Sequence, residues 1–156
     1  SCHGILNTAL GEWSIYMRPY FRGHNESKTQ RIPAGIMRAV LREDGFVSLH
    51  SAGKGEFWTV PFVVEVDRLG LNVKCASAGR LRVGIERILG DYDDMGSCTV
   101  EPVAGYGLDD CTEIQDDSTD AALNWAGGDL SALTGQTIRL RVQMHKADLY
   151  AIRFGD

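Results

Sequence analysis

The chain has 156 residues, 44% of them hydrophobic and 24% charged, which is the composition of a folded globular protein and excludes intrinsic disorder. Its formal net charge of −5 excludes nucleic acid and anionic membrane surfaces as expected partners, because both attract clustered Lys and Arg. No apolar run reaches the roughly 18–20 residues of a membrane-spanning helix, so we expect no membrane insertion.

Apolar and polar residues alternate with a period of two along most of the chain, as in strands with one buried face. The first two strands are expected within 13–22 and 36–42. Between them lies the polar loop HNESKTQR, whose Asn25-Glu26-Ser27 triplet makes Asn25 a formal candidate for N-glycosylation. Later strands are expected over 46–50, 57–66, 69–75, 80–86, 121–125, 138–145 and 149–154.

Turn signals between these segments include Gly53-Lys54-Gly55 and Ser77-Ala78-Gly79, and one helical turn is expected over 129–133, capped by Asp129. Many short strands with turns at short intervals predict an all-β fold, specifically an antiparallel jelly-roll-like β-sandwich. The side chains expected in its core are Leu81, Val83, Ile85, Trp125, Ile138, Leu140, Val142, Leu149, Ile152 and Phe154.

Seven blocks in the last 115 residues of the chain carry a resemblance to a known family. They are REDGFVSLHS (42–51), DRLGLNVKC (67–75), GRLRVGIE (79–86), GYGLDDC (105–111), DDST (116–119), GGDLSALTGQTIRLRVQM (127–144) and ADLYAIRF (147–154). In this order they resemble the C-terminal accessory β-sandwich that follows the five-bladed propeller in glycoside hydrolase family 32/43-like proteins. The resemblance implies a strand pair and loop at 1–41, similar to the last strands of a propeller, and a β-sandwich domain at 42–156. It also implies a secreted, extracellular or periplasmic protein.

The sequence offers no catalytic residues. Adjacent carboxylates at 93–94, 109–110 and 116–117 do not make a glycosidase pair, because neighbours on a strand point to opposite faces. The sequence has no GxSxG nucleophile motif and no Gly-rich phosphate loop. We therefore expect no enzyme activity from the chain by itself, although the resemblance implies that it is a part of a glycoside hydrolase-like protein.

Aromatic side chains are the candidates for binding sugar, because the apolar face of a pyranose stacks on an exposed ring. Trp58 follows Phe57 in an expected strand, so one of the two faces away from the core. Tyr92 and Tyr106 lie in expected loops beside acidic residues. For each ring the alternative is packing in the core.

Two acidic loops are candidates for a structural Ca²⁺, because this cation prefers carboxylate and carbonyl oxygens. One loop holds Asp91, Asp93 and Asp94, and the other holds Asp109 and Asp110. The alternative is that these carboxylates are solvated turn residues.

Four cysteines, Cys2, Cys75, Cys98 and Cys111, show no CxxC spacing, which disfavours zinc and thioredoxin-type chemistry. They form either buried free thiols or one or two disulfides. Cys98 and Cys111 flank a Gly- and Asp-rich segment and are the candidate pair.

These observations lead to two functional hypotheses. The first is a non-catalytic accessory module of a secreted carbohydrate-active protein, which binds glycan or supports a neighbouring catalytic propeller domain. The alternative is a structural or assembly module that pairs with another chain, including a second copy of itself, through exposed strands.

Overall fold

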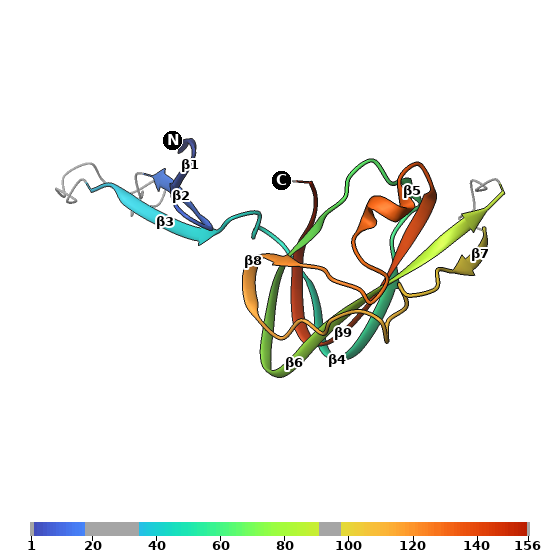
Figure 1. Ribbon diagram of the computed structural model, residues 1–156. Coiled ribbons are helices and arrows are strands. Elements are labelled where there is room, and N and C mark those ends of the chain that lie inside the picture. Colours follow the sequence, from blue (N-terminus) through green and yellow to red (C-terminus); the bar gives the residue numbers. More distant parts are fainter. Residues whose placement is uncertain (1, 18–34, 91–97, 156) are drawn as a thin grey trace. The chain divides into compact units, whose positions relative to one another are not determined.

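The computed structural model describes residues 2–17, 35–90 and 98–155, and it divides the chain into two compact units, Ser1–Phe46 and Val47–Asp156 (Figure 1). The sequence predicts a division after residue 41, five residues earlier. Residues 42–46 belong to the first unit because the backbone N–H of Glu43 donates to the carbonyl of Gly11, at 2.8 Å, and the ring of Phe46 packs on Trp13, with the centroids 5.6 Å apart.

The first unit is a three-stranded antiparallel sheet in the order β1-β2-β3. Its strands are β1 (Cys2–Ala9), β2 (Glu12–Met17) and β3 (Met37–Arg42). The strands expected within 13–22 and 36–42 are confirmed where they are described. The sequence pattern does not predict β1, because CHGILNTA lacks a regular alternation, and its pairing with β2 is irregular on both sides of the Ile5–Asn7 stretch.

One face of this sheet mixes polar and apolar side chains, since Leu6 and Val40 are paired with Ser14 there. On that face the buried Ser14 hydroxyl hydrogen-bonds the hydroxyl of Thr8 at 2.6 Å and accepts from Nε of Arg38 at 2.8 Å. The opposite face is apolar, since Ile5, Ile15 and Ala39 are paired across the three strands and Met17 is paired with Met37. Its members are Ile5, Trp13, Ile15, Met17, Met37, Ala39 and Leu41, which we call the apolar face.

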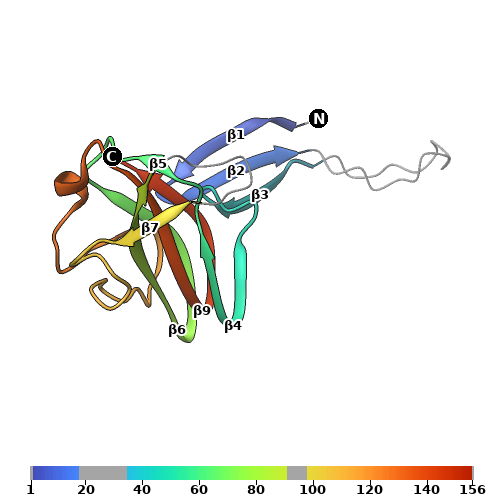
Figure 2. The same ribbon diagram turned by 90° about the vertical axis from the view of Figure 1, so that its right-hand side faces the viewer.

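The second unit is a six-stranded antiparallel sheet in the order β4-β9-β6-β7, with β5 beside β9 and β8 beside β6. The long strands β6 and β9 run side by side in both views (Figures 1 and 2). The elements are β4 (Leu49–Trp58), β5 (Phe62–Val63), β6 (Leu69–Leu89), β7 (Thr99–Pro102), β8 (Asp117–Ala122), a 3-10 helix η1 (Leu130–Leu133) and β9 (Thr137–Phe154).

The core lies between one face of this sheet and the loops on either side of β8, residues 103–116 and 123–133, whose apolar side chains cover that face and which we call the covering segment. Alternate side chains of β6 and β9 supply the sheet side, as the period of two predicts. Trp125 anchors the covering segment, because its ring is 7% exposed and its Nε1–H donates to the carbonyl of Val83 at 2.7 Å. The predicted core is confirmed for Leu81, Val83, Ile85, Trp125, Ile138, Leu140, Val142 and Leu149.

Two predicted core residues are less buried than expected. Ile152 is half-buried, and Phe154 is 49% exposed. Phe154 lies at the end of β9, where its ring packs edge-on against Phe62 at 5.0 Å at the margin of the core. The strand predicted at 149–154 is therefore correct, but burial fades toward the end of the strand.

Two of the predicted glycine turns lie inside strands. Gly53-Lys54-Gly55 is part of β4, where the pairing with β9 shifts between Ser51 and Lys54. Ser77-Ala78-Gly79 is part of β6, where residues 76–79 lie opposite the single residue Lys146. A Cβ on Gly79 would lie 2.3 Å from the carbonyl oxygen of Lys146, so the close approach of the two strands requires glycine there.

The all-β antiparallel class is confirmed and is consistent with a β-sandwich, while the jelly-roll topology stays a prediction. The expected helical turn is confirmed as η1, capped by the Asp129 carboxylate, which accepts from the backbone N–H of Ser131. Among the described residues, no helix has the length and apolarity to cross a membrane.

Candidate functional site

The outer face of the six-stranded sheet, opposite the core, carries a dense set of polar and charged side chains. Residues that are paired directly across antiparallel strands point to the same side, so the register places three rows together. We call this surface the polar face: Lys54, Glu56 and Trp58 of β4, Arg139, Arg141, Gln143 and His145 of β9, and Arg80, Arg82, Gly84 and Glu86 of β6.

Trp58 lies at one end of the polar face with 44% of its surface exposed. The guanidinium carbons of Arg139 and Arg141 lie 5.8 and 5.6 Å from the centre of its ring, within the range of cation–π attraction. Each arginine is also held by a carboxylate: Arg139 donates to Glu86 at 2.7 Å, and Arg141 donates to Glu56 at 2.8 Å. The hydrogen bond from Arg141 to Glu56 raises the pKa of Arg141. The indole is thus held in a fixed position on the surface.

A hollow of about 410 Å³ lies between β6, β9 and the loop after β7. Gly84 forms part of its lining, and a Cβ there would lie 3.1 Å from the backbone nitrogen of Leu108, so glycine lets this loop lie close to β6. Glu86, Asp109, Arg141 and Gln143 supply charged and amide groups to the lining. The hollow therefore offers both hydrogen-bond donors and acceptors.

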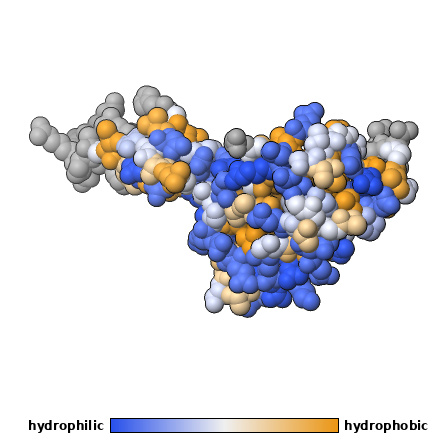
Figure 3. All heavy atoms as spheres, viewed as in Figure 1, coloured by the Kyte–Doolittle hydropathy of each residue, from blue (hydrophilic) through white to orange (hydrophobic). Residues whose placement is uncertain are grey.

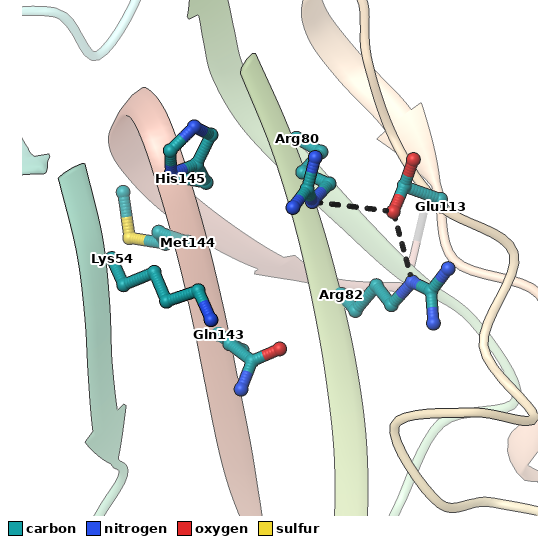
Figure 4. Close-up of a pocket in the computed structure, with 7 residues that line it drawn as sticks. All are labelled: Lys54, Arg80, Arg82, Glu113, Gln143, Met144 and His145. Carbon is teal, nitrogen blue, oxygen red and sulfur yellow. Dashed lines mark hydrogen bonds and ion pairs between the residues drawn. The ribbon is translucent and has the colours of Figure 1, made fainter. Parts of the chain in front are cut away.

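A second hollow, of about 270 Å³, lies at the other end of the polar face and shares Gln143 with the first. Figure 4 shows Lys54 from β4, Gln143 from β9, and Arg80 and Arg82 from β6 around it. We call it the cationic hollow, because three cations face one carboxylate, that of Glu113. Met144 and His145 complete its lining.

Glu113 lies between the two arginines of the cationic hollow. Its carboxylate is 3.7 Å from Arg80 and 3.1 Å from Arg82. A hydrogen bond from Gln115, together with the charges of Arg82 and Arg80, lowers the pKa of Glu113, so it is ionised at neutral pH. Arg82 also lies 3.5 Å from Asp109, whose side chain is fully exposed. Within the described residues Lys54 forms no ion pair.

The three rings predicted to bind sugar differ in their exposure. Trp58 is exposed on the polar face. Tyr106 is 4% exposed, and its hydroxyl lies 2.9 Å from the carbonyl of Gly127 and 2.8 Å from that of Asp129, so it fastens the covering segment to the core and presents no open ring face to a sugar. Tyr92 lies outside the described residues.

The predicted calcium ligands are not brought together where they are described. Asp110 accepts a hydrogen bond from the backbone N–H of Gly107, at 2.9 Å, and Asp109 points to Arg82. In the described ranges no group of three His, Cys, Asp or Glu side chains is placed to hold a metal ion. Asp91, Asp93 and Asp94 lie outside those ranges, as does the glycosylation candidate Asn25.

The predicted disulfide between Cys98 and Cys111 is wrong, since both are free thiols. Cys111 is buried, and its sulfur accepts from the backbone N–H of Val83 at 3.4 Å, whereas the sulfur of Cys98 lies 3.7 Å from Arg139. The two cysteines flank a common segment in the sequence, but each contacts a different residue across the sheet. Burial raises the pKa of the Cys111 thiol, which keeps it protonated.

Sequence reasoning identified Trp58 but did not identify Lys54, Arg80, Arg82 or Gln143 as one site. The available signal was the alternation in GRLRVGIE and IRLRVQMH, which puts these polar residues on one side of their strands. No family model, no curated protein and no solved structure matches this chain. The function is therefore inferred from the polar face and from the sequence blocks that carry the resemblance.

Proposed function

We propose that this chain is a non-catalytic accessory module of a secreted carbohydrate-active protein and that it binds glycan on the polar face. Trp58 is the observation that carries the proposal. The indole is 44% exposed and is held by two arginines over its ring, so the part of the ring that stays open offers a rigid apolar surface to a sugar at a small cost in side-chain entropy.

The surroundings of Trp58 support the same proposal. The adjoining hollow is lined by Glu86, Arg141 and Gln143, which carry donors and acceptors suited to sugar hydroxyls. Residues 79–86 and 127–144, which supply much of this lining, are also two of the blocks that carry the resemblance to the accessory sandwiches of glycoside hydrolase-like proteins.

The test is affinity electrophoresis and calorimetry of the whole chain against a panel of plant, algal and host polysaccharides. Trp58→Ala is expected to weaken binding about tenfold, which corresponds to roughly 1.4 kcal/mol of lost ring contact. The matched control is Phe154→Ala, which removes another exposed ring, 49% exposed, in the same unit but outside the polar face. Absence of binding to every glycan would overturn the proposal. The panel is run with calcium and with chelator, which also tests the predicted structural Ca²⁺.

A second candidate function is self-association through the first unit. Ile5, Met17 and Met37 on its apolar face are 47%, 37% and 50% exposed, and Figure 3 shows hydrophobic side chains in orange on the surface of this sheet. A second copy fits this face, because two like sheets that stack face to face bury each other's apolar side chains. Sedimentation velocity over a range of concentrations tests it: a dimer that forms on concentration supports this function, and a monomer throughout overturns it.

A further inference from the structure

The cationic hollow shows the class of glycan that would suit the polar face. The chain as a whole is acidic, with a net charge of −5, yet Lys54, Arg80 and Arg82 converge on a hollow with the single carboxylate of Glu113. Positively charged side chains that lie close together repel one another, and an anionic ligand bound among them relieves this repulsion.

The pairing inside the hollow leaves charge available for a ligand. Glu113 contacts both arginines and Asp109 lies 3.5 Å from Arg82, so two carboxylates face the two guanidinium groups and the surplus positive charge is that of Lys54. Lys54 lies on β4, on the other side of β9 from the two arginines; it is exposed and forms no ion pair within the part of the chain that is described. Gln143 lies between Lys54 and the two arginines, and among the described residues its side-chain amide forms no hydrogen bond with another side chain. His145 also lines the hollow, but its Nδ1 is buried, without a hydrogen-bond partner among the described residues, and is therefore less accessible to a bound anion than Lys54.

The cationic hollow and Trp58 lie on the same face of the sheet. Lys54 and Trp58 lie on the same side of β4, four residues apart, and Gln143 lines both hollows. Successive residues on one side of a strand are separated by about 6.5–7 Å, so Lys54 and Trp58 are about 13 Å apart, which is the scale of a few sugar units. A ring stacked on Trp58 and an acidic group in the cationic hollow can therefore belong to one chain of sugars.

We infer that the glycan bound on the polar face is acidic and that Lys54, Arg80 and Arg82 hold its carboxylate or sulfate, with the Gln143 amide as an additional donor. This inference rests on the proposed function. The guanidinium groups of Arg80 and Arg82 offer planar pairs of donors to an oxyanion, and Lys54 contributes a third charge from β4.

The test compares glycans that differ only in charge. The panel contains polygalacturonate, its fully methyl-esterified form, a sulfated galactan with its desulfated form, and polyglutamate as an anionic polymer without sugars. The expected result is binding of an acidic glycan at least tenfold tighter than of its neutral counterpart, with several-fold weakening when NaCl is raised from 50 to 500 mM. Carboxylate and sulfate are told apart by which acidic member of the panel binds.

Matched variants connect that preference to the hollow. Lys54→Gln and Arg80→Gln are each expected to weaken binding of the acidic glycan about 3- to 10-fold. Lys74→Gln is the control, because Lys74 is also an exposed lysine of the six-stranded sheet but lies outside the polar face, 3.9 Å from Asp117. Circular dichroism of each variant verifies that the fold is retained.

The outcomes separate the inference from the function on which it rests. Equal binding of esterified and free polygalacturonate, lost in Trp58→Ala but not in Lys54→Gln, overturns the acidic class and leaves glycan binding standing. No binding to any glycan overturns both. Binding of polyglutamate as tight as that of acidic glycans, unaffected by Trp58→Ala, also overturns both, since the surface would then be a simple polyanion site.

Discussion

Trp125 and Trp58 allow the fold and the site to be tested with one type of substitution. In Trp125→Phe, the carbonyl of the buried Val83 loses its donor, which costs about 1–3 kcal/mol. The smaller ring also leaves a cavity between the covering segment and the sheet, which costs about another 1–2 kcal/mol. The free energy of unfolding of the second unit should therefore fall by about 2–5 kcal/mol.

In Trp58→Phe the same chemical change is made at an exposed position, and its indole nitrogen lies 3.5 Å from Glu86, at the limit of a hydrogen bond. Its effect on the free energy of unfolding should be within about 0.5 kcal/mol, while glycan affinity falls.

Urea unfolding followed by circular dichroism measures both variants, without relying on the fluorescence of the residue that is changed. In a thermal scan of a unit of this size each kcal/mol lowers the midpoint by about 4 °C, so Trp125→Phe should unfold roughly 8–20 °C below the wild type. Equal midpoints for Trp125→Phe and the wild type would refute the packing of the Trp125 ring between the covering segment and the sheet. A destabilisation by Trp58→Phe as large as that by Trp125→Phe would refute the placement of Trp58 on the surface.

Two further predictions concern titratable groups. Burial opposes ionisation of Asp148, but hydrogen bonds from His50 and Ser48, each 2.9 Å long, outweigh it and lower the pKa of Asp148. The stabilisation is present above the unfolded-state pKa of about 3.9 and is lost as the pH falls through the lowered pKa of the folded protein. Asp148→Asn should therefore make the urea midpoint depend less on pH on the acid side. An acid-side slope as steep as that of the wild type would contradict this prediction. Because burial raises the pKa of Cys111, N-ethylmaleimide at about pH 8 should label Cys111 far more slowly than Cys98. Peptide mass spectrometry measures the labelling of each thiol. A Cys98–Cys111 disulfide in the purified protein would contradict the free thiols.

Much of the fold could be predicted from the sequence, because its signals are local. The alternation at 80–86 and 138–145 predicts both the strands and their buried sides, since side chains of a strand point alternately to opposite faces. The capped turn at Asp129 depends on a side chain and a backbone N–H two residues apart, so it too was predictable. Half of the site follows from the same pattern, because the polar members of each strand necessarily lie opposite the core.

Tertiary structure alone decided which strands are neighbours. Lys54, Arg80 and Gln143 come from three segments that lie far apart in the chain, and the register of β4, β9 and β6 brings them around one hollow. Tyr106 and Cys111 lie in a loop that the sequence marks as polar, yet the loop turns their side chains into the core. Such outcomes depend on strand order, register and the path of a covering segment, which are set by packing between distant parts of the chain and not by the spacing of residues within one strand.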